Sequence, residues 1–127
     1  MPKSIVPFSH KLADAKNDRL TKFYGDALKA IVAYHEEPSS KRDSLRGKMM
    51  HACEQLCDAV KRHSMELMQT VPDALCTISD VRHSKDVVDR NVASIIREVK
   101  QELEVYFPTT ARANNVRQLV PADVAAE

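Results

Sequence analysis

Glycine, tryptophan and long apolar runs are scarce in this sequence of 127 residues. It has two glycines and no tryptophan, and phenylalanine and tyrosine number three each. An all-β barrel or sandwich needs many turns and aromatic strand residues, so this composition argues against one. No apolar run approaches the roughly 20 residues of a membrane span, and the first residues lack the continuous apolar stretch of a signal peptide. We therefore expect a soluble protein in a reducing compartment, with no membrane partner.

Cysteine is also infrequent, and its pattern argues against both a disulfide framework and a metal site. The three cysteines are odd in number and irregular in spacing. Cys53 and Cys57 are four residues apart, which places them on neighbouring turns of one helix. A zinc site would need at least two more ligands, usually in closer spacing. We expect these cysteines to be buried as small apolar side chains, with no metal and no cofactor.

Three long stretches carry apolar residues at three- and four-residue steps, the spacing of amphipathic helices. Helices are predicted from about residue 10 to 35, from 41 to 68 and from 84 to 106, with a short helix over 72–81. Residues 1–9 contain two prolines and are interpreted as a flexible leader. Residues 108–127 are polar and lack clean periodicity, so we expect a mobile tail. Candidate helix caps are Ser39 or Ser40, Thr70 and Ser84.

The predicted fold class is all-α, with long antiparallel amphipathic helices. The apolar stripe from Leu45 to Leu67 steps close to heptad spacing, and pairing with a second copy would bury it more fully than one chain. We therefore predict a homodimer with a core of four-helix-bundle type. Residues 10–107 would form its single domain for dimerisation and ligand binding. A lone three-helix core is the alternative.

The predicted helix over 41–68 carries cations along one edge. Members seven residues apart form a line that spans 21 residues, or about 32 Å: Lys41, Lys48, Gln55 and Arg62. Ser44 and His51 lie beside this line. In the preceding helix, Lys22 and Lys29 point within about 20° of one another. The net charge is only +1, so the indication comes from the distribution of charge and not from its total.

A line of cations suits a nucleic-acid backbone, because phosphates form a long rail of negative charge. A-form RNA hides its base edges in a deep, narrow groove, so proteins recognise it by shape, phosphates and 2′-hydroxyls. The side chains of Ser44, His51 and Gln55 can hydrogen-bond such hydroxyls. The alternative interpretation is a solvated outer face that only keeps the helix in solution.

Two short segments carry a resemblance to a known family. The residues His51-Ala52-Cys53, followed by Arg62, Met65 and Pro72, resemble the second helix of the insect nodavirus RNA-silencing suppressors, the B-two type proteins. The basic turn from Pro38 to Asp43 resembles the start of that helix. The match covers about residues 20–80. That family forms an all-α homodimer whose antiparallel helices lie along one face of double-stranded RNA.

The resemblance implies a viral protein of the host cytoplasm that binds double-stranded RNA without sequence preference. Such binding suppresses host RNA silencing by shielding the duplex from dicing. The central arginine of the family falls within one position of Arg62, and its upstream basic residues fall near Lys41 and Arg42. No small-molecule substrate is implied.

A helical protein–protein adaptor that binds no nucleic acid is the alternative function, and its apolar seam would dock a partner helix. Catalysis is not expected. The pairs Ser9-His10, His63-Ser64 and His83-Ser84 are adjacent in sequence, and adjacent residues on a helix do not face each other. No orienting acid or oxyanion loop accompanies them. His63 falls on the apolar stripe, where a buried or interface histidine is expected.

Overall fold

The computed structural model describes residues 4–80 and 82–107, and all its regular elements in those ranges are helical. The all-α prediction is thereby confirmed for this part of the chain, whereas the predicted tail over 108–127 lies outside it. Within the described ranges, none of the helices has the length and apolarity needed to cross a bilayer. The elements are α1 (Ile5–Ala15), α2 (Asp18–Glu36), the 3₁₀ turn η1 (Ser39–Lys41), α3 (Arg42–His63), α4 (Met65–Met68), α5 (Asp73–Ser79) and α6 (Lys85–Tyr106).

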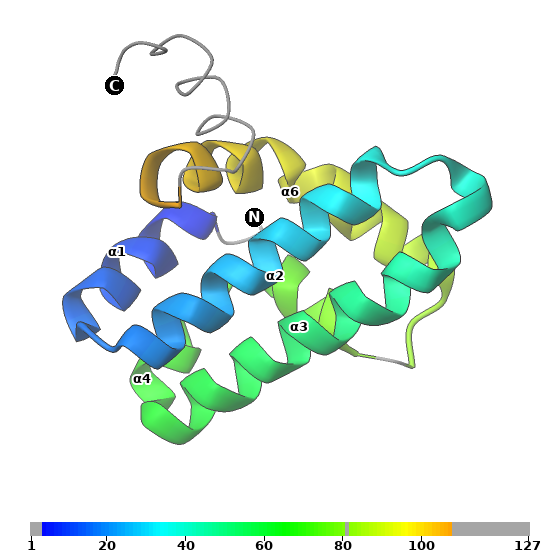
Figure 1. The fold of residues 1–127 in the computed structure, drawn as a ribbon. Helices are drawn as coiled ribbons and strands as arrows, with labels where there is room; N and C mark the ends of the chain where they lie inside the picture. Colours follow the sequence, from blue (N-terminus) through cyan, green and yellow to red (C-terminus); the bar gives the residue numbers. More distant parts are fainter. Residues whose placement is uncertain (1–3, 81, 108–127) are drawn as a thin grey trace, which may run out of the picture.

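The helices enclose one core. Helices α2 and α3 run antiparallel and side by side, α6 lies along the other side of α2, and α5 lies behind, in contact with both α3 and α6 (Figure 1). Helix α1 packs against α2, α4 and α6. The α2–α3 pair therefore presents one outer face, and every other helix lies behind it or beside it.

The apolar stripe of α3 is covered within one chain. Met49, Leu56 and Val60 are fully buried, and Leu45 is half-buried against the core. Helices α2 and α5 supply the cover. A second copy is therefore not needed to bury the stripe, and the homodimer stays a prediction without this argument. Periodicity indicates that a stripe is buried, but it does not indicate which surface buries it.

The interpretation of residues 1–9 as a flexible leader is wrong from residue 5 onward. Helix α1 begins at Ile5, and Ile5 and Phe8 are fully buried. The Ser4 hydroxyl caps the helix by accepting from the Val6 amide at 3.3 Å. Pro7 lies in the first turn, where amide donors have no partner inside the helix and proline is tolerated. Pro7 therefore belongs to a helix start and not to an irregular segment.

Two predicted helices are interrupted. Lys16 adopts a left-handed conformation with φ of 51° and ends α1. The Asn17 side chain then accepts from the Leu20 amide at 3.1 Å and starts α2, so the stretch 10–35 is not one helix. In the same way, Ser64 has an extended backbone, so α3 ends at His63. The Ser64 side chain then caps α4.

The predicted caps have mixed outcomes. Ser84 is the N-cap of α6 and accepts from the Val87 amide, as predicted. No side-chain hydrogen bond caps α3, whose N-cap is Lys41, or α5, whose N-cap is Pro72. Thr70 instead donates its hydroxyl to the Leu67 carbonyl at 2.6 Å. The cap predictions at Ser40 and Thr70 are therefore wrong, and the side chain of Ser39 lies outside the described ones.

Two tyrosines fasten α2 to α6 through their hydroxyl groups. The Tyr24 hydroxyl donates to Glu102 at 3.1 Å, and both side chains are buried. The Tyr34 hydroxyl donates to Asp89. Burial and the carboxylate of Glu102 raise the pKa of Tyr24. Burial, with Asp89 adjacent, raises the pKa of Tyr34 to about 12.

The stability of the protein is expected to fall as the pH rises from about 10 to about 12. The folded chain retains the Tyr34 proton in this window, whereas the unfolded chain, with a pKa near the ordinary value of about 10, releases it. A group with a raised folded-state pKa stabilises below the unfolded pKa and loses that contribution above it. Urea unfolding across this pH window measures the fall. Tyr34→Phe should show a shallower fall, and an identical fall in both proteins would contradict the assignment.

Candidate nucleic-acid interface

The predicted line on α3 lies at the protein surface. Helix α3 has 22 residues, and all four members of the line, Lys41, Lys48, Gln55 and Arg62, are exposed. Among the described residues, the ion pairs present do not involve Lys41, Lys48 or Arg62. We call these four residues the α3 line.

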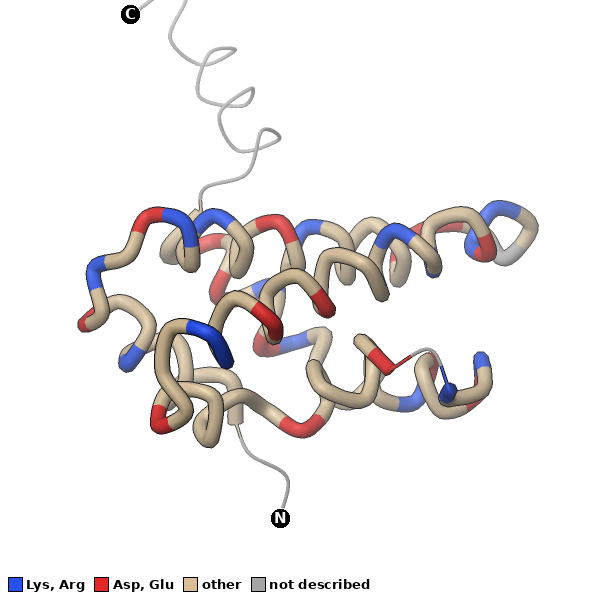
Figure 2. The backbone as a smooth tube through the Cα atoms, turned by 90° about the horizontal axis from the view of Figure 1, so that it is seen from below, with Lys and Arg blue, Asp and Glu red and all other residues tan. Residues whose placement is uncertain are grey.

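Acidic residues limit the charge around the α3 line. Asp58 is exposed on the same helix, about 60° around the axis from Gln55. Glu54 lies on the far exposed edge, about 120° from Lys48. Figure 2 shows the same mixture along the other helices, where positions of both signs recur. The α3 line is thus a narrow cationic edge on a molecule of nearly balanced charge.

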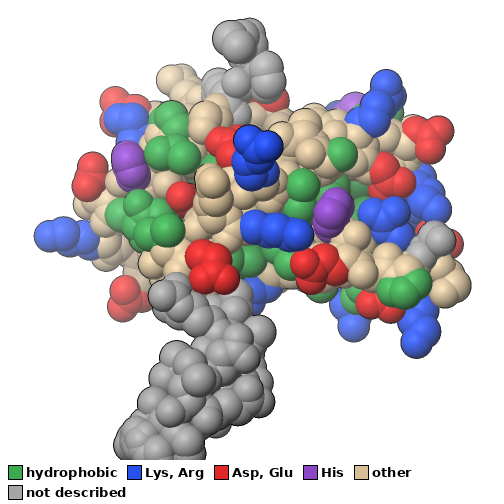
Figure 3. Space-filling view, turned by 90° about the horizontal axis from the view of Figure 1, so that it is seen from above, with side chains coloured by type: hydrophobic (Ala, Val, Ile, Leu, Met, Phe, Trp, Pro, Cys, Tyr) green, Lys and Arg blue, Asp and Glu red, His purple; other side chains and the backbone are tan. Residues whose placement is uncertain are grey.

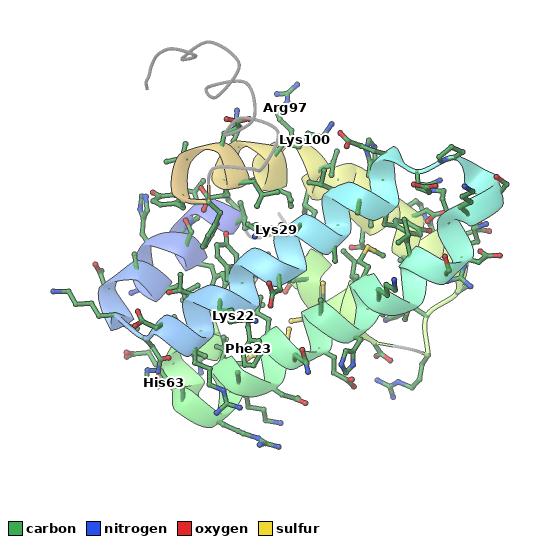
Figure 4. The ribbon with its side chains drawn as sticks, in the orientation of Figure 1. Lys22, Phe23, Lys29, His63, Arg97 and Lys100 are labelled. Carbon is green, nitrogen blue, oxygen red and sulfur yellow. The ribbon has the colours of Figure 1, made fainter. Side chains whose placement is uncertain are left out.

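Two further predicted RNA-binding residues, both lysines, lie on the neighbouring helix α2. Lys22 and Lys29 are exposed on α2 (Figure 4). Lys22 forms an ion pair with Asp26 at 3.0 Å, with side chains that are 73% and 47% exposed. Exposed pairs contribute little, in the range of about 0–1 kcal/mol, so a phosphate can compete for the lysine. Lys29 takes part in none of the ion pairs found in the described ranges.

Arg42, which was predicted to bind RNA, has a structural role. Its guanidinium lies 4.6 Å from the centre of the Tyr34 ring, and its Nε donates to the Tyr34 carbonyl at 3.2 Å. The side chain is half-buried. These contacts fasten the end of α2 to the start of α3. Arg42 therefore has contacts within the chain, and RNA binding by this residue stays a prediction.

The polar residues predicted beside the line are exposed. Ser44 donates its hydroxyl to the Lys41 carbonyl at 3.1 Å, which leaves the oxygen able to accept. His51 is exposed on the same side of α3. His63 is also exposed in this chain, so it is not a buried histidine, and a place at an interface stays a prediction. Helix α3 ends at His63, so this residue does not continue the buried apolar stripe of α3.

A groove lies where the start of α2 meets the end of α3, and it was not predicted. Its volume is about 370 Å³. The Arg19 guanidinium lies 5.4 Å from the centre of the half-buried Phe23 ring. Figure 4 labels Phe23 and His63 at this end of the hairpin. The groove is lined by Asn17, Arg19, Leu20, Phe23, Gln55, Asp58, Ala59, Arg62 and His63.

Sequence reasoning also missed two cations on α6. Arg97 and Lys100 are exposed on the helix that lies beside α2 (Figure 4). Lys100 forms an ion pair with Glu36 of α2 at 3.3 Å. Seen from above, cationic and acidic side chains are intermixed (Figure 3). The α3 line is thus separated from these residues by α2, and only the packing of the helices reveals their order.

The residues considered for catalysis or metal binding have local structural roles. Ser9 donates its hydroxyl to the Val6 carbonyl at 2.9 Å, and Ser64 and Ser84 cap helices. Cys53 and Cys57 are buried, as predicted. Burial raises the pKa of Cys53 to about 12, and a hydrogen bond with Cys76, together with burial, raises the pKa of Cys57. In the ranges that the structure describes, no three His, Cys, Asp or Glu side chains converge on a metal position.

Comparison of the chain with protein-family models, curated protein sequences and solved structures finds no match. The site is therefore interpreted from its own residues.

Proposed function

We propose that the α3 line binds double-stranded RNA without sequence preference. By covering the duplex, the protein would suppress host RNA silencing, which is the function that the sequence resemblance implies. The observation that carries the proposal is the exposure of Lys48 and Arg62 along one edge of α3, and of Lys41 at its N-cap, with no ion pairs to the described carboxylates.

The rigidity and length of the edge support a backbone ligand. Cations on one helix keep their spacing, and a line of about 32 Å spans several successive phosphates. Gln55 lies between Lys48 and Arg62 on the same line and can hydrogen-bond a 2′-hydroxyl. Lys22 and Lys29 would contact the same duplex from the neighbouring helix.

A homodimer would bring two α3 lines to one duplex and double the number of cations. The resemblance implies such a dimer. Since the apolar stripe of α3 is buried within the chain, the second copy would have to dock through another surface. The proposal for a single chain does not depend on this arrangement.

The adaptor alternative has less support. It required the apolar stripe of α3 to dock a partner helix, but Met49, Leu56 and Val60 of this stripe are fully buried. Within the described ranges, the large apolar side chains that remain exposed are Val6, Met65, Val105 and Tyr106. Met65 lies beyond the end of α3, and the others lie on α1 and α6.

Duplex RNA of random sequence is expected to bind with an affinity that falls steeply with salt. Each phosphate neutralised contributes about −0.9 to the slope of log K against log salt for duplex DNA, and five cations therefore predict roughly −3 to −5 per chain. Fluorescence anisotropy across a salt series measures this slope. A duplex DNA of equal sequence is the control and should bind more weakly, because it lacks 2′-hydroxyls and A-form shape. Absence of any RNA complex at low salt would refute the proposal.

A further inference from the structure

We infer that the groove between α2 and α3 binds one unpaired ribonucleotide. Three kinds of side chain that bind nucleotides line this groove: an aromatic ring, cations, and a carboxylate with an amide. The volume of about 370 Å³ is near the lower end of the range for small-ligand sites, about 300–1,000 Å³, and suits one nucleotide and not several.

The ring of Phe23 provides the surface for the base. It is half-buried between the start of α2 and the end of α3, so one part of the ring is open to the groove. Unpaired bases in RNA complexes stack on aromatic rings and on guanidinium planes. The guanidinium of Arg19 lies over this ring, 5.4 Å from its centre, so an incoming base would stack against the guanidinium plane or displace it from the ring.

Arg62 and His63 would bind the phosphate group of the nucleotide. Both line the groove and are exposed at the end of α3. A guanidinium binds two phosphate oxygens at once through parallel hydrogen bonds, and an imidazole donates one more. Arg62 has no ion pair among those of the described residues, so it is free to make this contact.

Asp58 selects the kind of nucleotide. Its carboxylate lines the same groove and accepts hydrogen bonds but donates none. Ribose hydroxyls are suitable donors, and a carboxylate is the usual partner of a ribose 2′-hydroxyl in nucleotide sites. The negative charge of Asp58 also opposes a di- or triphosphate. The Gln55 amide both donates and accepts, as hydrogen bonding to a base edge requires.

The position of the groove indicates where the nucleotide comes from. Gln55 and Arg62 belong both to the α3 line and to the groove, so the groove lies at one end of the line. A duplex lying along the line would present its terminus there. The occupant is therefore either the unpaired nucleotide of an RNA overhang, which rests on the proposed duplex binding, or a free ribonucleoside monophosphate, which does not.

The test compares a blunt RNA duplex with the same duplex carrying one unpaired terminal nucleotide, by fluorescence anisotropy at fixed salt. We expect the overhang to bind roughly tenfold tighter, the usual scale of one base–aromatic stack. Phe23→Leu should remove this gain while leaving blunt-duplex affinity unchanged, because leucine keeps the apolar packing but lacks the ring. An overhang nucleotide without its 2′-hydroxyl should lose part of the gain, and Asp58→Asn should lessen that loss.

Adenosine monophosphate alone, followed by NMR shifts at Phe23 and His63, distinguishes the two sources. Shifts at these residues without an overhang gain support the groove as a site for free nucleotides. Shifts without blunt-duplex binding leave the groove inference intact while the proposed function fails. The inference is overturned by absence of both the overhang gain and the nucleotide shifts. It is also overturned by a gain that persists in Phe23→Leu with an unchanged thermal unfolding curve.

Discussion

Replacing Lys48 and Arg62 together by alanine is expected to lower the affinity for duplex RNA about a hundredfold or more at moderate salt. Both side chains are exposed on the α3 line and belong to none of the ion pairs of the described chain. A hydrogen bond to a charged group contributes about 1.5–3 kcal/mol, so two lost phosphate contacts account for a change of this size. Anisotropy with a blunt duplex measures it.

The double substitution should leave the fold intact, since exposed positions without special contacts usually change stability by less than about 0.5 kcal/mol. The matched control is Lys61→Ala with Arg90→Ala. It removes the same charge from exposed positions, but Lys61 lies about 100° around α3 from Arg62, and Arg90 is on α6. The control should lose no more than about threefold. An equal loss in both proteins would show that net charge, and not the α3 line, governs binding.

Ile5→Ala is expected to destabilise the protein by about 2–5 kcal/mol, the range for isoleucine-to-alanine changes in a core. Ile5 is fully buried at the start of α1. Its amide also donates to the carboxylate of Glu98 on α6 at 3.2 Å, so this end of α1 is fastened to the body of the protein. Urea unfolding, compared by the midpoint at constant slope, measures the loss.

Val6→Ala is the control for this position. Val6 is the next residue on the same helix and is 39% exposed, so its truncation should cost well under 1 kcal/mol. The difference between the urea midpoints of the two variants measures the effect of burying Ile5 separately from any change in helix propensity. Equal midpoints for Ile5→Ala and the unchanged protein would mean that the first residues do not pack on the core in solution.

The helices that the sequence predicted well are those that carry their own local signals. Helix α6 begins one residue after its cap, Ser84, and its apolar positions Val88, Val92 and Val99 are buried. Helix α3 was located correctly apart from the break at Ser64. Both depend on periodicity and capping, which act between residues a few positions apart.

The errors occur where local signals permit two outcomes. Proline breaks a helix in its interior but is compatible with its first turn, so Pro7 alone did not distinguish a leader from the start of α1. Lys16 has a left-handed backbone although it is neither glycine nor asparagine. Lysine has no preference for this conformation, so the end of α1 could not be predicted from it. At Pro7, the burial of Ile5 and Phe8 in the core favours the helix.

In the candidate site too, features within one helix could be predicted, and features formed between helices could not. Most of the α3 line could be predicted because Lys48, Gln55 and Arg62 share one helix, and helix geometry fixes their relative directions. Lys41 is the N-cap and lies just outside the helix. The groove could not, because Arg19 and Phe23 come from α2, whereas Asp58 and Arg62 come from α3. The contacts of Arg42 could not be predicted either, because its partner, Tyr34, lies across the α2–α3 turn.

The sequence by itself determined that the described part of the chain is helical, where most of the helices in that part lie, and which cations share an edge of α3. Each of these follows from interactions within one helix, which have a fixed period. The tertiary structure alone decided that the apolar stripe of α3 is buried by its own chain, that α1 packs onto the core, and that two helix ends meet in a groove. These features depend on contacts between residues far apart in sequence, for which no spacing rule exists.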